Sequence, residues 1–332
     1  MKRSLIILLL VLAGHSIYSQ KISEEELIIA YYNTDQMYDY LDDEGVYDDE
    51  FTAKGTKTWG EQRYNNKLDE LAGIIGSLNG KELPGIIILG EIENKEVVKD
   101  LLDRKVFKKS GYRSDFYAHP GGKSIAILSS VDMPGGIETS IVNINGLNPE
   151  QSASIFHSTF VLADGNKYHL FVNNWSDRAS GLNGSGPSRI NCAVAVRKEI
   201  DKILNFERDA RILVVGTYYD EPTNKSVLMM LNASNKRKNL NYRDMYNPFY
   251  DAHNEKDVGT VSVNGSMQMY DFIIISPQLL KRTDGYSTGF SSGKVFTADM
   301  KEPLPTFRRD SYTEGASAHF PVYIKLSRPV RK

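Results

Sequence analysis

The chain has 332 residues, of which 41% are hydrophobic and 25% charged, a composition typical of a soluble globular protein. This length fits one large α/β domain or two small ones, and no shift in composition marks a linker between domains. The formal net charge of −2 gives no basic footprint for tight, sequence-independent nucleic-acid binding. Because a local groove could still be basic, the net charge argues only weakly against a nucleic-acid substrate.

The first twenty residues have the pattern of a secretory signal peptide. Lys2 and Arg3 precede an apolar run from Leu5 to Ala13, and small and polar residues follow. The apolar run is too short to span a membrane as a mature anchor, and no cysteine follows it that could carry a lipid. We therefore expect cleavage near residue 20 and a secreted protein, periplasmic or extracellular, without a membrane span.

Short apolar segments recur along the rest of the chain and predict β-strands. A hairpin is predicted where Ile155 to Ala163 and Tyr168 to Asn174 flank the turn sequence "DGN". The other predicted strands, in chain order, are Leu27 to Tyr32, Gly85 to Gly90, Ser124 to Ser129, Arg211 to Gly216, Asp271 to Ser276 and Phe320 to Leu326.

Helical periodicity lies between some of these strands. Apolar residues at helical spacing from Leu68 to Leu78 predict one helix, and those from Ile190 to Leu204 predict a second. A third helix is expected after Thr223, which could cap it. Cys192, the one cysteine, cannot form an internal disulfide and is expected to be buried in the second helix. Hairpins mixed with helices favour an α+β or layered α/β fold over a strictly alternating one.

The acidic stretch "YLDDEGVYDDEF", Tyr40 to Phe51, raises the question of a metal site. Its carboxylates lack the regular ligand spacing and central glycine of a calcium loop. We therefore interpret it as a solvated surface loop.

Polar residues gather where predicted strands end or begin, the usual place for an active site in layered α/β folds. From the residues alone, Glu91 could equally be a surface carboxylate and His319 a histidine at the core edge bonded to Asp271. The positions concerned are Asn33, Glu91, Asn173, Asn174, Trp175, Asp271 and His319.

Five blocks in order resemble the endonuclease/exonuclease/phosphatase superfamily: "DDEFTAKGTKTWGEQRYNNKLDELAGII", "GEIEN", "NNWSDRASG", "GTYYDEP" and "SAHFPVY". The likeness covers roughly Leu27 to Leu326 and is closest to exported bacterial members. It implies an α+β fold, a four-layer αββα sandwich of two mixed sheets, with residues 21–332 as a single domain. It also implies hydrolysis of phosphoesters or phosphodiesters assisted by Mg²⁺ or Mn²⁺, with a nucleic acid or phosphate ester as ligand.

The resemblance assigns roles to matching positions. Asn33 matches the asparagine of the first strand, and Glu91 matches the metal-binding glutamate. His319 matches the acid–base histidine, and Asp271 the aspartate that orients it. The hairpin block further implies substrate contacts from Asn173, Trp175 and Arg178.

Four other positions depart from the family pattern. Asn174 replaces a histidine, Thr217 an aspartate, Tyr219 an asparagine and Ala318 an aspartate, while the flanking residues of each block still match. These changes remove acid, imidazole and amide groups that stabilise an anionic transition state. The sequence therefore favours a catalytically impaired binding or scaffold protein.

The alternative is an active metal-dependent nuclease or phosphatase with a rearranged site. Asp35 or Asp220 would then supply the missing carboxylate. Ser317 lacks the glycine elbow of a nucleophilic serine and is discounted.

Overall fold

We analysed a computed structural model of the chain, which describes residues 22–43, 48–80, 82–119, 123–146, 153–178, 181–256, 258–282 and 285–331. The predicted signal peptide and its cleavage site lie outside these ranges. The assignment of residues 21–332 to one domain stays a prediction.

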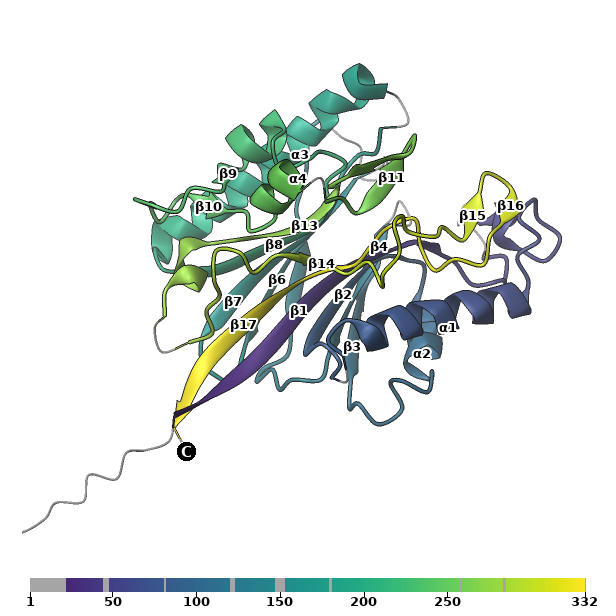
Figure 1. Cartoon of the computed structure of the whole chain (residues 1–332), viewed down its shortest axis with the longest axis horizontal. Helices are drawn as coiled ribbons and strands as arrows, with labels where there is room; N and C mark the ends of the chain where they lie inside the picture. The colour runs from purple at the N-terminus through teal and green to yellow at the C-terminus, as the bar shows by residue number, and fades with distance from the viewer. Residues whose placement is uncertain are drawn as a thin grey trace, which may run out of the picture.

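Two mixed sheets lie face to face (Figure 1). The first has the order β14 (Lys294–Val295), β17 (Val322–Arg331), β1 (Ile22–Met37), β2 (Ile86–Ile92), β4 (Ser124–Ser129) and β3 (Arg113–Tyr117). The second has the order β5 (Glu138–Ile141), β6 (Ser154–Val161), β7 (Lys167–Asn174), β8 (Arg211–Thr217), β13 (Asp271–Ile275), β10 (Met245–Tyr246) and β9 (Ala233–Ser234). Two small hairpins, β11 (Val261–Val263) with β12 (Ser266–Gln268) and β15 (Phe307–Arg308) with β16 (Ser311–Tyr312), complete the described strands.

Helices cover the outer faces of both sheets. Helices α1 (Glu61–Ser77) and α2 (Lys95–Leu102) lie against the first sheet, whereas α3 (Gly181–Phe206) and α4 (Tyr250–Lys256) lie on the side of the second (Figure 1). Short 3₁₀ turns occur at Asp49–Phe51 and Pro277–Leu280. The predicted four-layer αββα sandwich is thereby confirmed. None of the helices in the described ranges combines the length and apolarity needed to cross a bilayer.

The alternation of side chains along β1 explains the layering, because successive residues of a strand point to opposite faces. Leu27, Ile29 and Tyr31 pack into the core between the sheets. Ala30 and Tyr32 belong instead to the core beneath α1 and α2. Both faces of β1 are therefore buried, which is why its sequence is an unbroken apolar run.

Cys192 is fully buried in α3, as predicted. The helix predicted after Thr223 is present as one π-helical turn, Ser226–Met230, but its predicted cap is wrong: Lys225 rather than Thr223 is the N-cap, with no side-chain cap bond. Asn224 takes part in a tight turn instead, since its Oδ1 accepts a hydrogen bond from the Glu221 backbone N–H at 2.6 Å.

Strand direction determines where the polar strand ends meet. β1 is parallel to β2, and β7 is parallel to β8, so the carboxyl ends of these four strands lie at one edge of the sandwich. β13 and β17 run antiparallel to β8 and β1, so their amino ends lie at the same edge. The register pairs Asp271 with Thr217, and Val322 with Tyr31. All the strand-end residues singled out in the sequence therefore converge there.

Candidate functional site

Glu91 lies at the centre of the converging strand ends. Its Oε1 accepts hydrogen bonds from Asn174 Nδ2 at 2.8 Å and Asn33 Nδ2 at 3.1 Å. The pairing of β2 with β4 is interrupted by a bulge between Gly90 and Ile92, and Glu91 has a φ of 60°. A bulge of this kind redirects a side chain out of the regular strand alternation, which gives Glu91 its position beside residues from both sheets.

The charge of Glu91 is already balanced by the protein. Burial alone would raise the pKa of the Glu91 carboxyl, but the positive charges of Lys123 and His319 and the amide hydrogen bonds of Asn174 and Asn33 outweigh burial and lower it. Glu91 is therefore an anion that accepts hydrogen bonds from two amides and is stabilised by the charges of two nearby cations.

Thr217 forms a polar hub between the sheets. Its hydroxyl donates to Asp271 Oδ1 at 2.5 Å and accepts from Asn33 Nδ2 at 3.0 Å. The Tyr31 hydroxyl lies 2.9 Å away and must donate to Thr217, because the single proton of Thr217 is already given to Asp271. Gly90 makes this contact possible, since a Cβ there would lie 2.6 Å from the Tyr31 hydroxyl oxygen. At the position where the resemblance predicts a carboxylate, the Thr217 hydroxyl thus donates one hydrogen bond and accepts two.

His319 and Asp271 form the predicted pair, with His319 Nδ1 and Asp271 Oδ2 at 2.8 Å. Burial would lower the pKa of His319, but the charge and hydrogen bond of Asp271, with smaller contributions from Asp35 and Glu91, raise it to about 9. The Ser317 hydroxyl donates to the carbonyl of Asn33 and accepts from the His319 backbone N–H, which fixes the turn before β17. At neutral pH this imidazole is protonated, so it can donate a proton but cannot accept one from water.

Tyr219, predicted from the resemblance to stand in place of an asparagine, has a φ of 50°, a conformation that asparagine adopts more readily than an aromatic residue. Its ring lies 6.4 Å from the His319 ring, centroid to centroid, and 5.8 Å from Lys123 Nζ. Tyr218 points the other way, into the core, where it stacks on Phe272 with centroids 4.0 Å apart. Tyr219 thus brings a large apolar ring to the site.

The carboxylate of Asp220 does not reach toward Glu91 as a substitute ligand. It pairs with Arg189 Nε at 2.7 Å and with an Arg178 terminal nitrogen at 3.2 Å, and it accepts from the Ser226 hydroxyl at 2.6 Å. Arg178 also donates to the carbonyl of Tyr219 at 2.6 Å. These bonds anchor the loop after β8, so Arg178, predicted to contact substrate, here supports the loop.

Asn173 and Trp175 are fully buried, which corrects their prediction as substrate contacts. Asn173 Nδ2 donates to the carbonyls of Phe171 and Val215, each at 3.2 Å, and its Oδ1 accepts from Trp175 Nε1 at 3.0 Å. The same segment is tightly packed, because a Cβ on Gly216 would lie 2.0 Å from the Asn173 carbonyl oxygen. Both side chains therefore shape the site from beneath it.

Asp35 stands beside Ala318, where its Oδ2 accepts the Ala318 backbone N–H at 3.1 Å. Lys67 of α1, a residue that the sequence reasoning missed, donates to the Asp35 carbonyl at 2.7 Å while itself buried. Burial lowers the pKa of Lys67 to about 8 against the attraction of Asp35 and Glu91. The position of Lys67, next to Leu68 on the apolar face of the predicted helix, could have indicated that this lysine is buried. Lys123 was also missed, and no sequence pattern around it indicates a role in the site.

The groups that contact Glu91 are a poor ligand set for a divalent cation. Mg²⁺ and Mn²⁺ prefer several oxygen ligands, yet Thr217 and Ala318 offer no carboxylate, and Asn33 and Asn174 direct amide nitrogens at Glu91. The other oxygens of the site are Asn174 Oδ1, which is buried without a partner, and the Asp35 carboxylate beside Ala318. Lys123 and the protonated His319 would repel an added cation. A group of three acidic side chains does occur in the described ranges, but it consists of Asp43, Asp48 and Glu93 and does not include Glu91.

Comparison with known proteins gives a consistent family match. The model of the endonuclease/exonuclease/phosphatase family matches residues 28–328. No curated protein matches the chain.

Several solved structures share the fold at low sequence identity. An endonuclease/exonuclease/phosphatase family protein from Bacteroides thetaiotaomicron superposes with a TM-score of 0.55 at 14% identity, over 93% of this chain and 100% of that one. A mannosyl-6-phosphatase from the same organism gives 0.53 at 14%, over 90% and 99%. TDP2 from D. rerio, complexed with a single-strand DNA product, gives 0.55 at 13%, over 91% and 98%.

Proposed function

The chain belongs to the endonuclease/exonuclease/phosphatase family, and on that premise we propose that it is a secreted member with impaired metal-dependent hydrolysis. In this proposal the strand-end site serves to bind a phosphate-bearing ligand. The N-terminal pattern of charged, apolar and small residues supports secretion.

The observation that carries the proposal is the state of Glu91. Its carboxylate is bonded by the amides of Asn174 and Asn33 and balanced by Lys123 and His319, so the protein itself supplies what a cation would supply elsewhere in the family. The Thr217 hydroxyl supports the same conclusion, because it donates its proton to Asp271 and accepts from two further groups.

Ligand binding is supported by the positive groups that remain. Lys123 and the protonated His319 lie close enough to Glu91 to lower its pKa, and both would attract a phosphate group. Among structures of the same fold, one is named as a sugar phosphatase and another holds a DNA product. We therefore propose a nucleic acid or another phosphate ester as the ligand class.

The retained His319–Asp271 pair favours a second candidate, an active enzyme with a rearranged site. It predicts cleavage that depends on Mg²⁺ or Mn²⁺ and is lost in Glu91→Ala and His319→Ala. The impaired protein predicts no hydrolysis above background with either metal.

The test is a paired assay of the mature chain and a variant carrying Asn174→His, Thr217→Asp, Tyr219→Asn and Ala318→Asp. Hydrolysis of single-stranded DNA and of p-nitrophenyl phosphate would be measured with Mg²⁺, with Mn²⁺ and with EDTA. Loss of one transition-state donor raises the activation barrier by about 3 kcal/mol, and loss of one acid–base group lowers the rate by about a hundredfold. Such losses do not simply add. We expect the variant to gain roughly a thousandfold over the natural chain, with the gain abolished by EDTA.

Binding is tested separately by fluorescence anisotropy with a labelled single-stranded oligonucleotide and with inorganic phosphate as competitor. We expect Lys123→Met to weaken binding by about tenfold, because it removes one charge facing the site. Chelator-sensitive turnover by the natural chain would establish the active enzyme instead. Absence of both binding and turnover would refute the ligand-binding role.

A further inference from the structure

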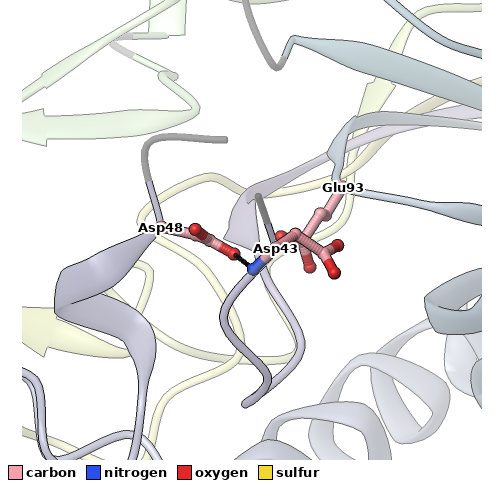
Figure 2. A group of neighbouring side chains, drawn as sticks. All are labelled: Asp43, Asp48 and Glu93. Carbon is pink, nitrogen blue, oxygen red and sulfur yellow. Dashed lines mark hydrogen bonds between the residues drawn. The ribbon is translucent and has the colours of Figure 1, made fainter. Parts of the chain in front are cut away.

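Three carboxylates that lie far apart in the sequence meet beside the strand-end site. Asp43 follows β1, Asp48 precedes the 3₁₀ turn Asp49–Phe51, and Glu93 follows β2. One ligand oxygen from each lies within 4.8 Å of those of the other two, and Figure 2 shows the side chains turned toward one another. The backbone N–H of Asp43 donates to Asp48 Oδ2 at 3.2 Å, which joins these two residues directly.

Two oxygens of this cluster are buried without a hydrogen-bond partner: Asp48 Oδ1 and Glu93 Oε1. Asp48 as a whole is only 1% exposed. A buried carboxylate oxygen with no donor is strongly unfavourable, since folding has removed the water that would otherwise solvate it. These oxygens therefore call for a hydrogen-bond donor or a positive charge that the described residues do not supply.

The protein supplies no such charge itself. Among the described residues, the ion pairs made by lysine, arginine and histidine do not involve Asp43, Asp48 or Glu93. Asp39 adds a fourth carboxylate nearby, and its backbone N–H donates to Glu93 Oε2 at 2.7 Å.

We propose that Asp43, Asp48 and Glu93 bind a calcium ion. Ca²⁺ accepts six to eight oxygens at about 2.3–2.6 Å in flexible geometry, so ligands on opposite sides of the ion lie up to about 5 Å apart. The three oxygens lie within 4.8 Å of one another, so they could bind Ca²⁺ without moving closer together. Mg²⁺ requires about 2.0–2.1 Å and near-ideal octahedral geometry, which three carboxylates from two loops do not impose.

The ion would join the loop after β1 to the end of β2. Glu93 is two residues beyond Glu91 and precedes Asn94, whose Oδ1 caps α2 by accepting the Val97 N–H at 2.9 Å. Holding Glu93 would therefore steady the segment that carries Glu91 from a position that takes no part in its hydrogen bonds. The site does not depend on whether the strand-end site hydrolyses or binds a phosphate.

The test titrates CaCl₂ into the EDTA-treated, dialysed mature chain by calorimetry, and follows the Tm in parallel. We expect one saturable site, and a Tm rise of about 5 °C at a hundredfold excess of Ca²⁺ over the Kd. Asp48→Asn and Glu93→Gln should lose binding and the Tm rise. Their calcium-free Tm should not fall below that of the natural chain, because an amide relieves the repulsion.

Asp42→Asn and Asp49→Asn are matched controls, since they remove the same charge from exposed positions of the same segment. They and Glu91→Gln should bind Ca²⁺ within about twofold of the natural chain. Absence of a saturable site, or unchanged affinity in Asp48→Asn, would overturn the proposal. Binding of Mg²⁺ as tight as that of Ca²⁺ would overturn the choice of ion.

Discussion

Replacing Thr217 by valine removes one hydroxyl while keeping the shape of the side chain. The Tyr31 hydroxyl, in a side chain only 1% exposed, would lose the partner to which it donates, and Asp271 Oδ1 would lose a charge-assisted bond of 2.5 Å. Asn33 Nδ2 would keep its bond to Glu91. Each buried group left without a hydrogen-bond partner destabilises the fold by about 1–3 kcal/mol. The methyl group that valine adds recovers less than about 1 kcal/mol of this loss. We expect a loss of about 3 kcal/mol.

The loss would be measured by urea unfolding followed by tryptophan fluorescence, together with a thermal scan. A loss of 3 kcal/mol corresponds to a fall in Tm of roughly 6 °C for a chain of this size. Thr217→Ser is the control, because it keeps the hydroxyl and should lose about 1 kcal/mol for the missing methyl group. Equal stability of Thr217→Val and Thr217→Ser would refute the reasoning, since the hydrogen bonds of the Thr217 hydroxyl would then contribute nothing to stability.

Three further outcomes follow from buried groups. Because the pKa of His319 rises from its ordinary 6.5 to about 9 on folding, its contribution to stability is complete below pH 6.5 and is lost as the pH rises through 9. The Tm should fall over that range in the natural chain, and His319→Gln should flatten the fall; equal slopes would contradict the pairing with Asp271. Arg189→Met removes the more buried of the two arginines that pair with the Asp220 carboxylate. It should lower the free energy of unfolding, measured in urea, by about 3 kcal/mol, whereas a loss below about 1 kcal/mol would show that the pair is dispensable. Burial raises the pKa of the Cys192 thiol to about 12, so a thiol reagent at pH 8 should label it only after unfolding, and rapid labelling of the folded chain would mean that α3 is not packed as described.

Much of the fold could be predicted because its central strands are buried on both faces and read as apolar runs. The predicted strand Ser124 to Ser129 coincides with β4. β3 and β5 were missed because they are edge strands with exposed polar residues and little alternation. α2 was missed because it has only eight residues, although its Asn94 cap was a usable signal.

The strand-end site could be predicted further than most sites because predicted strand ends and the family resemblance together single out Asn33, Glu91, Asn174 and Thr217. The hydrogen bonds and ion pairs within the site could not be predicted, for example the ion pairs of Asp220 with Arg178 and Arg189. The acidic stretch was only partly understood. Asp42 and Asp49 are exposed as expected of a solvated loop, but Asp48 is buried beside Glu93, a contact across 45 residues that no local spacing can indicate.

The Thr217 hydroxyl has a consequence for how this protein could change over time. This hydroxyl of the second sheet is hydrogen-bonded to Tyr31 of the first sheet and to Asp271 of its own sheet, and so joins the two sheets. An aspartate at position 217 would place a second carboxylate against Asp271 and break both bonds unless a cation bound with it. A change at this position alone would therefore lower the stability of the fold, so a compensating change would have to precede or accompany it.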